Sequence, residues 1–171
     1  MKKFILTVLS FIALGAYNHA MAQENPPEKN PDLKNAGKHT GHKKSGKMHR
    51  QGRYGWKNGD RVEGSLVEGQ IEGYGRYSWT DGDIYQGDFK DGKQDGKGSA
   101  FYADKCNVYE GEWKNGKRNG YGKLIWANGD VYEGYWVDDV RVGEGTFTAA
   151  NGDKYVGHYE NNQRNGFGTY Y

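Results

Sequence analysis

A fixed spacing of glycines is the feature of this sequence that most constrains its fold. Five glycines, each two residues after an aromatic residue or a valine, follow one another at intervals of 23, 24, 23 and 23 residues: Gly64, Gly87, Gly111, Gly134 and Gly157. A Gly-x-Gly pair comes nine residues after each of them: Gly73/Gly75, Gly96/Gly98, Gly120/Gly122, Gly143/Gly145 and Gly166/Gly168. A register kept over so many copies indicates a tandem array of one structural unit.

Each unit predicts a β-hairpin. In the first strand of one unit, Tyr109 and Trp113 alternate with charged residues, the period-2 pattern of a strand with one buried face. The second strand, residues 120–126, alternates again, and Asn128-Gly129-Asp130 closes the unit. Because Asn-Gly pairs readily take positive φ at both central positions, we expect a tight hairpin turn there. The spacing divides residues 51–171 into a partial unit 52–61, full units 62–84, 85–108, 109–131 and 132–154, and a partial unit 155–171.

The core of such an array must consist mainly of aromatic rings. The mean hydropathy is −1.04 and 28 of the 171 residues are glycine, so a thick aliphatic core cannot form. Each fully buried ring contributes about 1.5–3 kcal/mol. A glycine two residues from a large ring leaves space for that ring to lie across the strand, which permits strong curvature. The sequence therefore predicts an all-β fold: an elongated, twisted, single-layer antiparallel sheet of tandem β-hairpins.

Two candidate binding surfaces follow from this fold. A single-layer sheet covers only one face of its rings, so some rings are expected to line an open groove. The groove candidates are Trp79, Tyr102, Trp113, Trp126 and Trp136. The expected final strand, residues 166–171, lacks charged residues that would block the pairing of a further strand. The candidates for a self-association edge are Phe167, Tyr170 and Tyr171.

Residues 1–22 have the pattern of a secretory signal peptide. Lys2 and Lys3 precede a short apolar stretch, and Ala20-Met21-Ala22 supplies the small residues that signal peptidase requires. We expect cleavage after Ala22 and a periplasmic or secreted mature chain. An uncleaved membrane anchor is the alternative, but the apolar stretch of about 14 residues is shorter than the roughly 20 that span a bilayer.

Residues 23–50 are expected to be a disordered basic linker, because they hold all three prolines and almost no large apolar residue. They carry +4 (seven Lys/Arg against three Asp/Glu), whereas residues 51–171 carry −4 (fifteen against nineteen). A nucleic-acid-binding protein places its positive charge on the folded part, so that class is not expected. Two further roles stay open for the linker: attraction to an anionic membrane surface, and transient binding of a soft metal ion by His39, His42, Met48 and His49.

The repeated unit resembles the MORN (membrane occupation and recognition nexus) repeat, in the form of an exported bacterial protein. The resemblance is carried by Tyr109-Glu110-Gly111-Glu112-Trp113-Lys114-Asn115-Gly116-Lys117-Arg118-Asn119-Gly120-Tyr121-Gly122 and covers roughly residues 52–171. It implies a long sheet of successive hairpins that serves as a scaffold or binding surface. Lipid binding is often ascribed to the family, and some members dimerise through their terminal repeats.

Three departures from the repeat predict local changes. Val62 and Leu66 replace rings in the first full unit, as in a degenerate cap. Asp138-Asp139 and Asn161-Asn162 lack the glycine of the sister connections, so two changed turns are expected. Cys106 lies in a turn that is one residue longer, which predicts a local change of twist. As the only cysteine it forms no internal disulfide, and an intermolecular bridge stays open.

Nothing in the sequence predicts an enzyme. The Gly-x-Gly pairs and the carboxylates recur in every unit and are therefore read as structural, and no His/Cys group has zinc-ligand spacing. We expect no catalytic residue, cofactor or resident metal. The predicted function is an exported scaffold that binds another protein or itself in the cell envelope. The alternative is a module that binds anionic lipid or an envelope glycan through the aromatic groove and the basic linker.

Overall fold

The computed structural model describes residues 36–40, 43–44, 47–48 and 50–171. The predicted leader, the cleavage after Ala22 and residues 23–35 lie outside the described residues. The strands are β1 (Ala36–Thr40), β2 (Lys43–Lys44), β3 (Lys47–Met48), β4 (Arg50–Trp56), β5 (Arg61–Val67), β6 (Gln70–Ser78), β7 (Ile84–Lys90), β8 (Lys93–Tyr102), β9 (Asn107–Lys114), β10 (Lys117–Ile125), β11 (Val131–Val137), β12 (Val140–Thr148), β13 (Lys154–Glu160) and β14 (Gln163–Tyr170). β1, β2 and β3 lie within residues 23–50, for which the sequence predicts a disordered linker.

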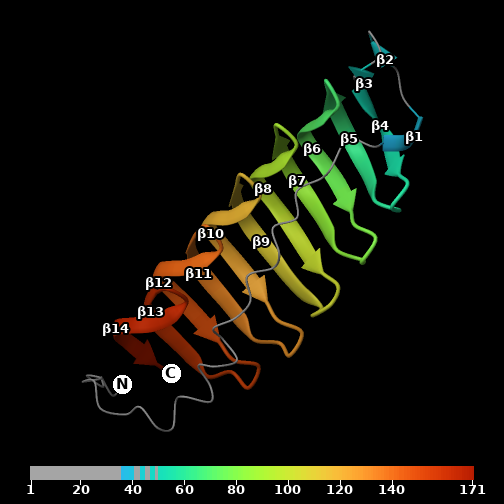
Figure 1. Cartoon of the computed structure of the whole chain (residues 1–171). Coiled ribbons are helices and arrows are strands. Elements are labelled where there is room, and N and C mark those ends of the chain that lie inside the picture. The colour runs from blue at the N-terminus through green and yellow to red at the C-terminus, as the bar shows by residue number, and fades with distance from the viewer. Residues whose placement is uncertain (1–35, 41–42, 45–46, 49) are drawn as a thin grey trace.

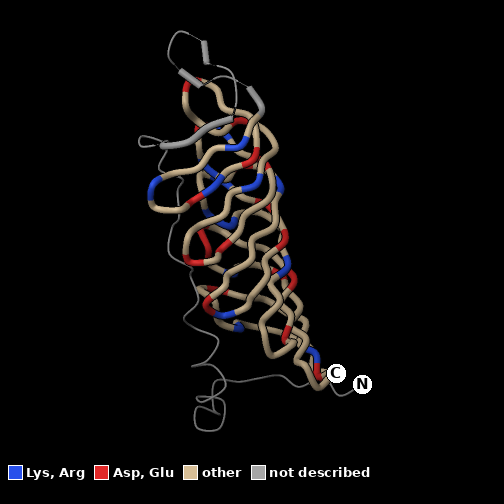
Figure 2. Tube along the Cα trace, turned by 90° about the vertical axis from the view of Figure 1, so that its right-hand side faces the viewer, with Lys and Arg blue, Asp and Glu red and all other residues tan. Residues whose placement is uncertain are grey.

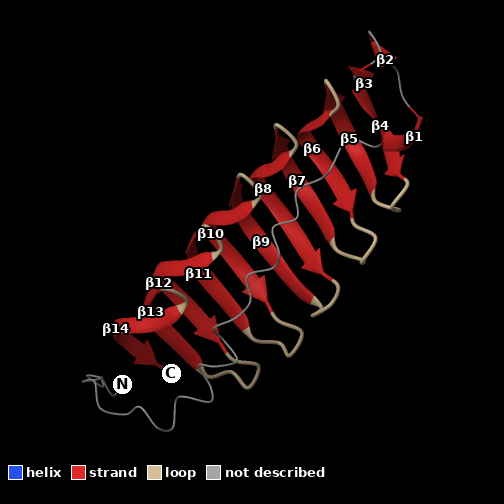
Figure 3. Ribbon diagram, in the orientation of Figure 1, coloured by secondary structure: helices blue, strands red, loops and turns tan. Residues whose placement is uncertain are grey.

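Among the described residues, twelve strands form one antiparallel sheet in the order β1-β4-β5-β6-β7-β8-β9-β10-β11-β12-β13-β14. From β4 to β14, strands that follow each other in the chain are neighbours in the sheet, so the hairpins form an elongated staircase (Figure 1). Figure 3 shows strands joined by short loops, with no helix in the described part of the chain. β2 and β3 form a separate two-stranded ladder. The predicted single-layer, all-β array is confirmed.

The first glycine of each Gly-x-Gly pair forms a bulge in the second strand of its hairpin. Around Gly120, β10 has two more residues than β9 between the pairs on either side. Gly120 has a φ of 100°, a left-handed value that favours glycine. The next side chain, Tyr121, points outward and is 45% exposed. The same register shift recurs beside Gly73, Gly96, Gly143 and Gly166. Since a bulge bends its strand, every hairpin bends at the same level.

The second glycine makes room for a tyrosine ring in four of the five pairs, at Gly98, Gly122, Gly145 and Gly168. A Cβ atom on Gly122 would overlap the hydroxyl group of Tyr109, whose ring lies across Gly111 and Gly122. This hydroxyl donates a hydrogen bond to the main-chain oxygen of Glu112 at 3.1 Å. The equivalent hydroxyl bonds are made by Tyr85, Tyr132 and Tyr155. The prediction that rings lie across the in-strand glycines is confirmed.

Two kinds of turn connect the strands, one kind at each end of the strands. At one end, two-residue turns such as Asn115-Gly116 have φ values of 51° and 86°, those of a type I′ turn. At the other end of the strands the connections are longer, and we call them long turns. In the long turn 126–130, the Gly129 N–H donates to the Trp126 carbonyl at 2.9 Å, and Gly129 is the one residue with positive φ, 91°. The prediction of positive φ at both central residues is therefore wrong for Asn128-Gly129-Asp130, because this longer loop reverses the chain with one left-handed residue.

The expected turn changes do not occur in the backbone. Asp138-Asp139 has φ values of 46° and 69°, and Asn161-Asn162 has 50° and 66°, so both are type I′ turns like their glycine-containing sisters. Asp and Asn tolerate the left-handed region better than most residues, which explains this result. Cys106, with a φ of 52°, also takes a left-handed conformation, and the ladder between β8 and β9 runs as far as Tyr102 and Asn107.

The inner face of the sheet carries one continuous layer of rings. The Tyr109 ring meets the rings of Trp113 in its own strand and Trp136 in the next hairpin edge to face, with centroids 5.2 and 5.6 Å apart. Edge-to-face pairs contribute about 0.5–1.5 kcal/mol beyond burial. The buried apolar side chains are Tyr54, Trp56, Val62, Leu66, Ile71, Tyr77, Tyr85, Phe89, Ala100, Tyr109, Trp113, Leu124, Tyr132, Trp136, Phe147, Ala149, Tyr155 and Tyr159. The core thus runs the length of the array and has no single centre.

Candidate interaction site

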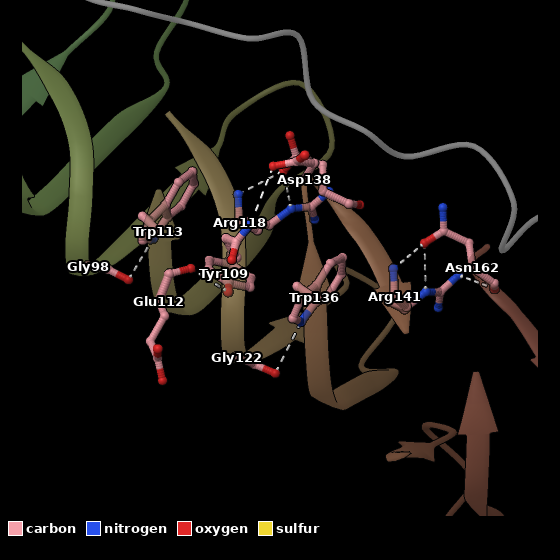
Figure 4. Close-up of polar contacts among 12 residues, drawn as sticks. Gly98, Tyr109, Glu112, Trp113, Arg118, Gly122, Trp136, Asp138, Arg141 and Asn162 are labelled. Carbon is pink, nitrogen blue, oxygen red and sulfur yellow. Dashed lines mark hydrogen bonds and ion pairs between the residues drawn. The ribbon is translucent and has the colours of Figure 1, made fainter. Parts of the chain in front are cut away.

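A column of polar side chains runs through the ring layer. Gln94, Arg118 and Arg141 occupy equivalent places in successive hairpins, and all three are buried. Arg118 Nε donates to Asp139 Oδ1 at 2.8 Å, and the Arg118 main-chain N–H donates to the same atom at 3.1 Å. The guanidinium carbon lies 4.2 Å from the ring centroid of Trp136. These contacts join the β9–β10 hairpin to the turn of the β11–β12 hairpin (Figure 4).

Arg141 repeats this arrangement with an amide in place of the carboxylate. Its main-chain N–H and its Nε donate to Asn162 Oδ1 at 2.9 and 3.4 Å, and its guanidinium also donates to the Asn162 carbonyl at 3.0 Å. Burial lowers the pKa of Arg141. These contacts were not predicted from the sequence. The available signal was an arginine followed 21 residues later by Asp139 or Asn162, at the two turns that depart from the glycine pattern.

The five candidate groove residues do not share one environment. Trp113 and Trp136 belong to the core, 7% and 3% exposed, and their indole N–H groups donate to the carbonyls of Gly98 and Gly122 at 3.2 and 3.3 Å (Figure 4). Trp79, Tyr102 and Trp126 are half-buried and pack against the core from its long-turn side. Only these last three therefore retain ring surface that a ligand could reach.

The candidate self-association residues lie on and beside β14, an edge strand of the sheet. Phe167 is 81% exposed, Tyr170 51% and Tyr171 69%. Within the described residues, β14 pairs with β13 on one side and with no strand on the other. The Arg164 guanidinium lies 4.6 Å from the Tyr155 ring centroid and donates to the Tyr170 hydroxyl at 3.2 Å. This edge therefore presents open backbone groups beside exposed rings.

The hydrogen-bond pattern shows which backbone groups of β14 point outward. Tyr171 N–H donates to the Lys154 carbonyl at 2.9 Å, and Lys154 N–H donates to the Tyr171 carbonyl at 3.2 Å. In an antiparallel ladder such hydrogen-bonded pairs alternate with pairs whose N–H and C=O groups face away. The backbone groups of Tyr170 and Gly168, opposite Tyr155 and Gly157, therefore face the open edge.

A second series of hydrogen bonds joins consecutive long turns. Asp60 Oδ1 accepts from the Thr80 main-chain N–H at 2.9 Å. Three further oxygens accept from the N–H twenty residues later at 2.8, 3.2 and 2.8 Å: those of Asp83, Asn107 and Asp130. Asp153 holds the same place in the last hairpin, and among the described residues its carboxylate bonds to Asn151 but to no following turn. The last hairpin thus has the same acceptor group that each earlier hairpin uses to bond to the next long turn.

An open depression of about 570 Å³ lies at the other end of the sheet, lined by Arg53, Glu63, Tyr74, Arg76 and Gln86. Arg53 Nε pairs with Glu63 Oε1 at 2.9 Å, and the Gln86 amide donates to the Tyr74 hydroxyl at 2.7 Å. Four of the five polar side chains are thus engaged with one another. The depression is a weaker candidate than the β14 edge.

The described part of the chain offers no centre for metal chemistry. No group of three or more His, Cys, Asp or Glu side chains there could hold a metal ion. The same residues include no helix of the length and apolarity needed to cross a bilayer. Charged residues of both signs are spread along the sheet instead of converging on one site (Figure 2). This arrangement is that of a tandem-repeat interaction module.

The family model of the MORN repeat matches six segments of the chain: residues 39–61, 63–84, 85–106, 109–131, 132–154 and 155–171. The chain therefore belongs to the MORN repeat family, as the resemblance in the sequence implies. Repeats of this family are non-enzymatic modules and generally serve as scaffolds for interactions with proteins or membranes. The first match begins at residue 39, ahead of the partial unit expected at residue 52.

A solved structure similar to this chain is the SAS-4 (dCPAP) TCP domain of Drosophila melanogaster, in complex with a proline-rich motif of Ana2 (dSTIL). The two share 14% sequence identity with a TM-score of 0.40, and the alignment covers 86% of this chain and 98% of the other. No curated protein matches the chain.

Proposed function

We propose that this chain is an exported, non-catalytic scaffold of the cell envelope that binds protein through the open edge of β14, with a second copy of itself as the first partner. The observation that carries the proposal is the edge itself. Tyr170 and Gly168 direct backbone groups away from β13, and Phe167 and Tyr171 expose their rings beside them. Export is supported by the leader pattern of residues 1–22.

Strand addition is the binding mode that this edge favours. An added strand would take up the outward N–H and C=O groups, and its side chains would cover the neighbouring rings. A second copy offers the same edge, so that the interface is self-complementary.

The test is the mass of the purified chain by multi-angle light scattering. We expect an oligomer that dissociates to the monomer when Phe167 and Tyr171 are both changed to lysine, because two like charges repel at a self-complementary edge. The matched control changes Tyr74 and Val137, which are 62% and 50% exposed elsewhere on the sheet, to lysine. A monomeric parent, or equal masses for all three proteins, would contradict self-association.

The half-buried rings support a second candidate function, the binding of anionic lipid or an envelope glycan. Trp79, Tyr102 and Trp126 retain exposed ring surface at intervals of one hairpin, so sugar rings could stack on them in series. Residues 23–50, with their net charge of +4, would add attraction to an anionic surface.

Sedimentation with anionic vesicles and pulldown on envelope glycan separate this candidate from the first. Binding should decrease when Trp79 and Trp126 are changed to alanine, and stay unchanged for the lysine variant of the β14 edge. Vesicle binding that survives both the alanine changes and removal of residues 23–50 would exclude both the groove and the linker as the binding surface.

A further inference from the structure

A repeated contact joins the two-residue turns to the hairpins that precede them. In four of these turns, the second residue donates its N–H to a main-chain carbonyl of the preceding hairpin. The donors and acceptors are Gly92 and Ile71, Gly116 and Gln94, Asp139 and Arg118, and Asn162 and Arg141, at 3.1, 2.8, 3.0 and 3.2 Å. The four acceptors therefore hold one equivalent position in successive hairpins, which we call the receiving position.

The side chain at the receiving position matches the turn residue that it meets. The two arginines bond to Asp139 and Asn162, whereas the other two residues bond to glycines. Besides accepting the N–H, each arginine donates its main-chain N–H and its Nε to the Oδ1 atom of the turn residue, and Nη2 to its carbonyl (Figure 4). Glycine has no side-chain oxygen to accept the first two of these bonds. An arginine at this position thus selects Asp or Asn in the turn.

Arg164 holds the receiving position of the last hairpin. Like Arg118, it is the second residue after its own turn, and it lies opposite Tyr159 in the ladder with β13. Its guanidinium carbon lies 4.6 Å from the Tyr155 ring centroid, and that of Arg118 lies 5.6 Å from the equivalent Tyr109 ring. Because the register is the same, the N–H and C=O of Arg164 face away from β13. In the described chain no strand pairs with β14 on that side.

We propose that Arg164 makes the edge of β14 specific for a β-hairpin of another protein that carries Asp or Asn as the second residue of a two-residue turn. This inference rests on the proposed function, because it uses the same open edge, and it adds what a partner must present there. Asp139 and Asn162, the two described turn residues of this kind, are already bonded within the array. A second copy therefore offers no free turn of this kind in its described residues, and it would compete with such a partner for the edge.

The contacts within the array also indicate where the partner's strand should lie. Gly120 pairs with Trp136, and Gly143 pairs with Tyr159. In both cases the bonded Asp or Asn comes three residues after the aromatic residue. Gly166 holds the equivalent place in the last hairpin. The partner should therefore place an aromatic residue opposite Gly166 and its Asp or Asn three residues later.

The test measures how the full chain binds a hairpin probe. The probe is a backbone-cyclised, fluorescein-labelled peptide of residues 131–148, which form β11, the turn at Asp138-Asp139 and β12, and whose end residues pair with each other. Fluorescence anisotropy gives the affinity. A probe with Asp139→Gly should bind at least about tenfold more weakly, because it lacks the oxygen that accepts from the charged guanidinium. A probe with Asp139→Asn should bind better than the glycine probe, since Asn162 accepts in the same way.

A change in the chain shows whether Arg164 causes this preference. Arg164→Ala should remove the difference between the parent and glycine probes, whereas the control Arg76→Ala, at an exposed arginine on β6, should keep it. The comparison of the probes on the parent chain needs no change in the protein, so it decides even if Arg164→Ala fails to fold. No binding of the parent probe, equal binding of the parent and glycine probes, or a preference that survives Arg164→Ala in the folded protein would overturn the inference.

Light scattering separates failure of this inference from failure of self-association. An oligomeric parent chain that binds the parent and glycine probes equally would retain the proposed interface between copies and overturn the selection of the turn. A monomeric parent chain that prefers the parent probe about tenfold would contradict self-association and support the inference.

Discussion

Arg118 donates its Nε hydrogen to Asp139 Oδ1 across 2.8 Å and 21 residues of sequence, and both residues are buried. Neither group would be tolerated alone at this place, because an unpaired buried charge is costly. The pair is thus an electrostatic bond between one hairpin and the turn of the next. It also keeps the Arg118 guanidinium over the Trp136 ring.

Replacing Asp139 by glycine should destabilise the fold by about 3–5 kcal/mol, because it leaves the Arg118 charge buried without its carboxylate. The turn itself should persist, since Gly116 holds the same place one hairpin earlier with a φ of 86°. Urea unfolding followed by tryptophan fluorescence measures the change. The control is Asp139→Asn, which copies the natural partner Asn162 of Arg141 and should cost clearly less. Equal losses for both variants would contradict this expectation, because they would show that the acceptor oxygen kept by asparagine does not support Arg118.

Gly122→Ala should destabilise the fold by about 1–3 kcal/mol through overpacking, because its Cβ atom would overlap the Tyr109 ring and hydroxyl. Gly55 provides the matched control. An added Cβ there meets only the Asp60 carbonyl, at an ordinary 3.9 Å, so Gly55→Ala should change the free energy of unfolding by less than about 0.5 kcal/mol. Thermal unfolding by circular dichroism compares the two, and similar midpoints would argue against the packing role of Gly122.

Acid should weaken the contact between the first two long turns. Burial raises the pKa of Asp60, but hydrogen bonds from Thr80, Asn58 and Tyr77 outweigh it and hold the pKa below the ordinary 3.8. A depressed carboxyl pKa stabilises the fold above the unfolded-state pKa, and this contribution is lost as the pH falls through the folded-state pKa. The loss should therefore occur below about pH 4.

The control for this prediction is Asp60→Asn, which copies Asn107, the residue that accepts the equivalent hydrogen bond at 3.2 Å. The difference in melting temperature between the parent and this variant should be largest near neutral pH and should disappear in acid. A difference that is constant from pH 7 to pH 2 would mean that the ionisation of Asp60 does not contribute to stability.

Export predicts a defined N-terminus. Intact-mass measurement of the chain isolated from the envelope of its host should give a mature protein that begins at Gln23, because cleavage is expected after Ala22. Changing Ala20 and Ala22 to larger residues should block processing and leave the full mass. A chain that retains residues 1–22 in its native form would favour the membrane anchor.

The period and composition of the sequence were enough to predict the sheet, its hairpins and the tyrosines that lie across glycines. These features depend on patterns within one unit, such as Tyr109 two residues before Gly111. The conformations of the turns were harder to predict, because Asn115-Gly116 and Asn128-Gly129 look alike in sequence although their loop lengths differ. Contacts between units were missed. The pairing of Arg118 with Asp139 depends on how neighbouring hairpins are placed against each other, which the sequence of a single unit does not encode.

The hydrogen bonds between the long turns always join residues twenty positions apart, in every pair of neighbouring hairpins where they occur. Through these bonds, each hairpin therefore contacts only the hairpin before it and the hairpin after it. Duplication or loss of one whole unit would leave the remaining contacts intact, whereas an insertion between two bonded residues would disturb the contact that spans it. The extra residue in the turn at Cys106 lies between two such spans, and the bonds on both sides of it are kept. In evolution such a chain can change its length in whole units without redesigning its interior.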